Sequence, residues 1–179
     1  MGAATAASSK EISDGLEKFA AVAKTVDLSY ETAAAAVATV VDKTRQSADV
    51  VGTAFKTIFA RMEGLSLGDT LEDGVNLNKY SEALEKVGVN ILNAQGELRS
   101  MDAILDDLGT KWQGLGEETQ VALAQTVGGV RQYNQMMSLM NNWEDVKDNI
   151  ELAKNATGEL ATQQAIWAKS YEGSLERLN

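Results

Sequence analysis

Residues 53–62 read TAFKTIFARM, and this stretch sets the expectation for the fold. Phe55, Ile58 and Phe59 lie three and four residues apart, which aligns large apolar side chains along one face of an α-helix. A helix with such a face buries it against other elements. The stretch therefore predicts a packed helix, and its side chains favour an assembly role over catalysis.

A second stretch, VALAQTVGGVRQYNQMMSLM at residues 121–140, also carries an apolar helical pattern. Gly128 and Gly129 interrupt this pattern, which predicts either a kink or close helix packing. The methionines that follow have flexible side chains that suit a core, the commoner use, or an adaptable partner surface. The residues predicted to pack or to contact a partner are Phe55, Ile58, Phe59, Leu84, Trp112, Val130, Tyr133, Met136, Met137 and Met140.

The composition favours helices throughout the chain. The 179 residues include no proline, the main helix breaker, so the 15 glycines must supply the breaks. We therefore expect a mainly α fold, either a multi-helix bundle or an elongated helical array, with one short β-hairpin. The hairpin is predicted near residues 89–99, because Val89 and Ile91 alternate there before a turn that ends at Gly96.

Several helix starts follow from side chains that can cap a helix. Ser8 and Glu11 have the spacing of a capping box, in which each side chain accepts a hydrogen bond from the other residue's backbone. Ser47 or Asp49 is expected to open the helix that contains TAFKTIFARM, and Ser100 is expected to open another helix.

The charge balance and the missing residue types exclude several kinds of site. The chain has 26 acidic and 16 basic residues, a formal charge of −10, and neither cysteine nor histidine. An acidic surface repels nucleic acid, so direct nucleic-acid binding is not expected. Disulfides are excluded, as are zinc or haem sites built on cysteine or histidine. No apolar run approaches the roughly 20 residues of a membrane helix, so no membrane span is expected in this segment.

Two groups of acidic residues are the remaining candidates for chemistry. Asp69, Glu72 and Asp73 fall in a glycine-containing loop, but their spacing does not fit a calcium-binding loop, so a solvated acidic loop is favoured. Asp102 and Asp106 lie one helical turn apart, and a polar helix face is favoured over a catalytic carboxylate pair. No catalytic, cofactor-binding or metal-ligating residue is predicted, and the chain is not expected to be an enzyme.

One long segment includes TAFKTIFARM, LNKYSEAL and AQTVGGVRQY in that order. It resembles the central region of tail tape measure proteins from long-tailed phages and prophages, over about residues 51–178. The resemblance implies a virion structural protein that acts in tail assembly, sets the tail length and leaves the tail when the viral genome is ejected at infection. It also implies a location in the virion tail lumen, and in the host cytoplasm during assembly.

The same resemblance implies particular partners. These are the tail tube and tail assembly chaperone proteins, together with self-association of the full-length protein. The chain is expected to be a fragment of a longer protein, with an N-terminal helical segment at residues 1–48 and a tape-measure-like helical core at residues 49–179. The alternative is a helical recognition segment that is bound by a tail chaperone, a tube protein or a host protein that senses phage.

Overall fold

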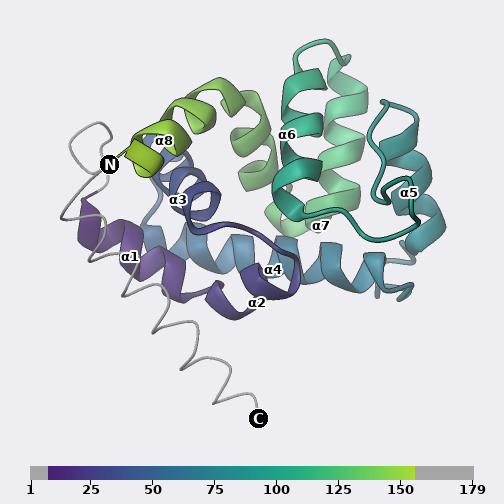
Figure 1. Ribbon diagram of the computed structural model, residues 1–179, viewed down its shortest axis with the longest axis horizontal. Helices are drawn as coiled ribbons and strands as arrows, with labels where there is room; N and C mark the ends of the chain where they lie inside the picture. The colour runs from purple at the N-terminus through teal and green to yellow at the C-terminus, as the bar shows by residue number, and fades with distance from the viewer. Residues whose placement is uncertain (1–7, 156–179) are drawn as a thin grey trace.

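The computed structural model describes residues 8–155, which form eight α-helices and no β-strand within that range. Figure 1 shows α4 along the long axis of the molecule, with α1, α2, α3 and α8 toward one end and α5, α6 and α7 toward the other. The prediction of a mainly α fold is confirmed, while residues 156–179 of the predicted helical core lie outside the described residues. The helices are α1 (Ser9–Glu17), α2 (Ala20–Thr25), α3 (Tyr30–Thr44), α4 (Ala48–Ser66), α5 (Leu77–Glu85), α6 (Met101–Trp112), α7 (Glu117–Asn141) and α8 (Trp143–Asn155).

Helix α3 lies inside the bundle. Residues 33–41 read AAAAVATVV, and every one of them is buried. Their small side chains allow neighbouring helices to come close, and α1, α4, α7 and α8 all pack against α3. The one hydroxyl on this stretch is also satisfied, because the side-chain amide of Asn149 on α8 donates a hydrogen bond to Oγ1 of Thr39 at 3.0 Å.

The predicted caps account for where several helices begin. The Ser8–Glu11 capping box is confirmed: Oγ of Ser8 accepts from the backbone N–H of Glu11 at 3.2 Å, and Oε2 of Glu11 accepts from that of Ser8 at 2.6 Å. Ser47, rather than Asp49, caps α4. Ser100 caps α6 as predicted. Each cap satisfies a backbone N–H that has no partner inside its helix.

The prediction of a β-hairpin near residues 89–99 is wrong. The segment is a loop closed by one isolated antiparallel bridge between Leu92 and Leu98. The Asn93 side chain explains the difference, because its Oδ1 accepts from the backbone N–H groups of Gln95 and Glu97, both at 2.9 Å. A side chain that binds nearby backbone in this way competes with the regular ladder of a hairpin.

Candidate functional surfaces and the packed core

An aromatic cluster joins α4 to the break between α1 and α2. The rings of Phe55 and Phe59 lie 5.7 Å apart between centroids, and the ring of Phe19 lies 5.6 Å from the first and 5.9 Å from the second. Phe19 sits at the break between α1 and α2, where its backbone leaves the helical conformation. Phe55, Ile58 and Phe59 are all fully buried, so the apolar face of TAFKTIFARM belongs to the core.

A second packing centre joins α6, α7 and α8. Trp112 is fully buried, and its indole N–H donates to Oδ1 of Asn141 at 2.7 Å. The ring of Trp143 lies over Gly109, and a Cβ on that glycine would lie 2.2 Å from the ring. Gly109 therefore allows a close contact that no larger residue permits. Leu84 is buried to 1% exposure and anchors α5 to the same half of the molecule.

Helix α7 is broken at Gly129, so the predicted interruption at Gly128 and Gly129 is a true break. Gly129 has φ 75° and ψ 169°, which lie far from helical values. The break changes which side of the second half of α7 faces the core. As a result Val130 is 73% exposed instead of packed, which corrects its place among the packing candidates.

The other candidates on α7 divide between core and partial exposure. Met136 and Met140 are fully buried. Tyr133 and Met137 are half-buried and pack against the edge of the core. The methionine cluster is therefore mostly internal, and only Met137 offers part of its side chain to a partner.

Arg61 connects the break in α7 to the acidic loop after α4. Its Nε donates to the backbone carbonyl of Thr126, one turn before the break, at 3.1 Å. Its terminal nitrogen forms a salt bridge with the carboxylate of Asp73. One guanidinium thus satisfies a carbonyl at the broken helix end and fixes the loop. The sequence gives no local signal of this role, because Thr126 is 65 residues from Arg61 in the chain.

Substitution of Gly129 with alanine should destabilise the protein. Its backbone conformation is one that essentially only glycine adopts, and strain of this kind costs about 1–3 kcal/mol. Gly128→Ala is the matched control, because a Cβ there would meet its nearest atom at an ordinary 3.4 Å. Urea denaturation of both variants checks the prediction, and equal effects would contradict it.

The Arg61–Asp73 contact also gives the stability a pH dependence. Partial burial acts to raise the pKa of Asp73, but hydrogen bonds from Arg61 and from the Val75 N–H outweigh it and hold the pKa below its usual 3.8. Because the folded-state pKa is lowered, the contact stabilises the protein above about pH 4, and this contribution is lost as the pH falls through the folded-state value.

Asp73→Asn should therefore reduce stability at pH 7, and its difference from the unmodified protein should shrink as the pH falls below about 4. The side chain of Asp73 is 39% exposed, so the effect at pH 7 is modest. Urea denaturation from pH 7 to pH 3 measures it. Asp69→Asn removes a charge from the same loop as the control, and a difference that stays constant with pH would refute the role of Asp73.

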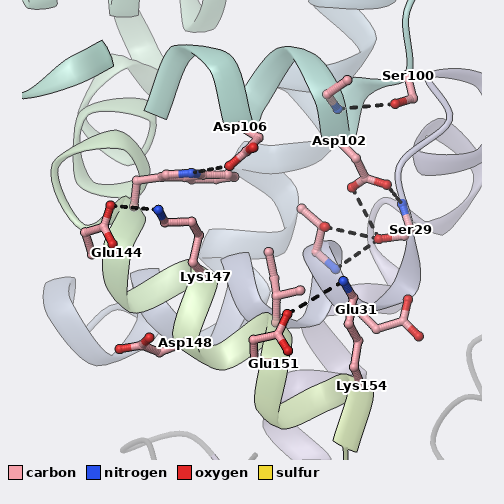
Figure 2. Close-up of a pocket in the computed structure, with 14 residues that line it drawn as sticks. Ser29, Glu31, Ser100, Asp102, Asp106, Glu144, Lys147, Asp148, Glu151 and Lys154 are labelled. Atoms are coloured by element: carbon pink, nitrogen blue, oxygen red, sulfur yellow. Dashed lines mark hydrogen bonds and ion pairs between the residues drawn. The ribbon is translucent and has the colours of Figure 1, made fainter. Parts of the chain in front are cut away.

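A groove with a volume of about 830 Å³ lies between α3, α6 and α8. Figure 2 shows Asp102 directed at Ser29, which donates to it from its backbone N–H at 3.0 Å and from its hydroxyl at 3.2 Å. Asp106 instead accepts from the indole N–H of Trp143 at 3.1 Å. These two carboxylates bind different partners and connect helices, so their role is structural.

The charged side chains of α8 in this groove also bind one another. Lys147 pairs with Glu144 at 2.9 Å, and Lys154 pairs with Glu151 at 3.8 Å (Figure 2). Exposed pairs of this kind contribute little to stability. The described residues hold no group of three or more acidic side chains placed to bind a metal ion. No helix within residues 8–155 is long and apolar enough to cross a membrane.

The fold and its surfaces define a class of protein. It is a helical packing unit, in which large side chains and charged groups connect the helices. The sequence matches the model of the phage-related minor tail protein family over residues 1–129. The chain belongs to this family, and its place is therefore in a phage tail. No solved structure matches the chain.

Proposed function

We propose that this chain is a tape measure segment, which acts in tail assembly, sets the tail length and leaves the tail at infection. The observation that carries the proposal is helical content in a member of a phage tail family. A helix has a fixed rise of about 1.5 Å per residue, so chain length converts into physical length in a defined ratio. The resemblance of residues 51–178 to tape measure proteins supports the same role.

The fixed rise per residue of a helix makes the proposal quantitative. The 148 residues from 8 to 155 would span roughly 220 Å as one continuous helix, far more than the folded bundle of eight short helices. A ruler built from this segment therefore requires the bundle to open inside the tail. Its packing residues then serve the protein before or during assembly, when an exposed apolar face would aggregate.

Tail length in the phage that encodes this chain tests the proposal. In-frame deletion of residues 8–155 should shorten the tail by about 220 Å, and duplication of the same residues should lengthen it by a similar amount. Deletion of residues 77–155 alone should shorten it by about 120 Å. Electron microscopy of negatively stained particles measures all three. Tails of unchanged length in the duplication would reject the ruler function.

The proposal includes a non-enzymatic role, partners and a location. We place the segment in the virion tail lumen, in contact with the tail tube, and in the host cytoplasm with a tail assembly chaperone before that. Self-association belongs to the full-length protein. The charge of −10 argues against direct contact with the nucleic acid that shares the tail.

A second candidate function is recognition of this segment by another protein, such as a tail chaperone, a tube protein or a host sensor of phage. One observation favours it. Leu67, at the end of α4, is 69% exposed, and Leu98, in the isolated bridge with Leu92, is 48% exposed. Both leucines line one groove.

A further inference from the structure

A small groove with an apolar floor lies where the end of α4 meets the start of α6. It has a volume of about 220 Å³, which suits one or two apolar side chains. Its floor consists of the buried side chains of Val26, Met101 and Ile104. Leu67 and Leu98 line it from two different segments and are 69% and 48% exposed. Exposed leucines around an apolar floor are typical of a surface that another protein covers.

The walls of this groove are held in place by hydrogen bonds. The backbone N–H of Met101 donates to the carbonyl of Val26 at 2.9 Å, which ties the two sides together. Arg99 donates to the carbonyl of Asn90 at 2.9 Å and to the carboxylate of Asp107 at 2.7 Å. The groove is therefore formed before any partner arrives, which reduces the entropy that binding must overcome.

The rim of the groove is acidic. Asp27 and Glu63 line it, and neither carboxylate forms an ion pair within residues 8–155. Arg99 is the one cation among the described residues that line the groove, and Asp107 already neutralises it. The position of Asp27 is fixed, since its backbone N–H donates to the carbonyl of Lys24 at 2.9 Å and its φ is 54°.

We propose that this groove binds a segment of a partner protein that presents a leucine-like side chain flanked by lysine or arginine. The apolar side chain enters between Leu67 and Leu98, and the cations meet Asp27 and Glu63. Charge complementarity of this kind favours the encounter and selects the partner. A second copy of the chain is disfavoured, because its charge of −10 would bring acidic surfaces together. The inference gives a partner chemistry to the recognition role proposed above and rests on it.

A synthetic amphipathic helical peptide of leucine and lysine is the probe, with a leucine–glutamate peptide of the same pattern as its counterpart. Fluorescence anisotropy measures affinity for the whole chain. We expect the lysine peptide to bind and the glutamate peptide to bind at least about tenfold more weakly. The double variant Leu67→Ser/Leu98→Ser should weaken binding of the lysine peptide by about tenfold or more.

Leu152→Ser is the matched control, because Leu152 is 45% exposed and lies on α8, outside the groove. It should leave the affinity unchanged. Asp27→Asn/Glu63→Gln should weaken binding and reduce its salt dependence. All the substituted side chains are at least partly exposed, and circular dichroism checks that each variant is folded.

Several results would overturn the proposal. These are no binding of the lysine peptide, equal binding of both peptides, or equal losses in the Leu152 control and the groove variants. A dimer of the chain that the Leu67→Ser/Leu98→Ser variant dissociates would assign the groove to a second copy instead. The tail-length experiment is independent of these outcomes, so failure of the groove and failure of the ruler function are distinguishable.

Discussion

Phe59→Ala should lower the free energy of unfolding by about 3–5 kcal/mol, the usual cost of removing a buried aromatic ring. The ring is fully buried and lies 5.7 Å from that of Phe55 and 5.9 Å from that of Phe19. Alanine would leave a cavity between α4 and the break that separates α1 from α2. These segments meet through the aromatic cluster, so its loss should weaken the whole N-terminal half.

Urea denaturation followed by circular dichroism measures this effect. Val50→Ala is the control, because Val50 belongs to the same helix but is 47% exposed. Surface substitutions of this kind usually change stability by less than about 0.5 kcal/mol. A Phe59→Ala variant with the unfolding midpoint of the control would show that the ring is not part of the core.

Gly52→Ala should destabilise the protein by about 1–3 kcal/mol or more, although alanine is the better helix former. A Cβ on Gly52 would lie 2.3 Å from the carbonyl oxygen of Gly15. The obstacle is backbone, so no side chain can rotate away, and α1 must move off α4 to relieve the overlap. Gly15 is also closely approached, although less severely, since its own Cβ would lie 2.9 Å from the side chain of Val37.

Gly64→Ala separates this overlap from the intrinsic effect of alanine in a helix. Gly64 lies on α4 as well, and a Cβ there would lie 3.2 Å from a carboxylate oxygen of Asp69, a side chain that can move. We expect Gly64→Ala to be neutral or slightly stabilising in thermal unfolding. A Gly52→Ala protein as stable as the Gly64→Ala protein would disprove the close crossing of α1 and α4.

Local patterns in the sequence predicted much of the secondary structure, because capping and amphipathic spacing act over a few residues. Ser8 and Ser100 could each be assigned as a helix start in this way, and the start of α4 could be narrowed to Ser47 or Asp49. The break at Gly129 was one of the two alternatives that local composition allowed, the other being close helix packing. Its consequence did not follow from local composition, because the exposure of Val130 depends on the angle between the two halves of α7.

Long-range contacts could not be predicted from the sequence. Gly52 and Gly109 lie inside helices, where glycine is unfavourable, and that cost is a signal of close approach. The sequence does not say that the approaching groups are Gly15 and Trp143. The role of Arg61 was hidden for the same reason, since its partner at Thr126 is distant in the chain. The hairpin prediction failed because alternation alone ignores the local bonds of an asparagine side chain.

The groove lined by Leu67 and Leu98 was also invisible in the sequence. Both residues stand beside glycine-containing turns, where an isolated leucine has no periodic pattern to place it. The fold brings them to one surface because α4 ends next to the segment that leads into α6. The proposed recognition surface is therefore a property of the tertiary structure, because residues distant in the chain form it.

Small-angle X-ray scattering of the whole chain measures most directly whether these helices form one compact bundle before assembly. The 148 residues from 8 to 155, packed compactly, would have a radius of gyration of about 15 Å, and we expect the whole chain to lie far closer to this value than to an extended one. One continuous helix of residues 8–155 would instead give a radius of gyration of about 60 Å. A value near the larger figure, with full helical content, would contradict the packed core on which the stability predictions and the groove depend.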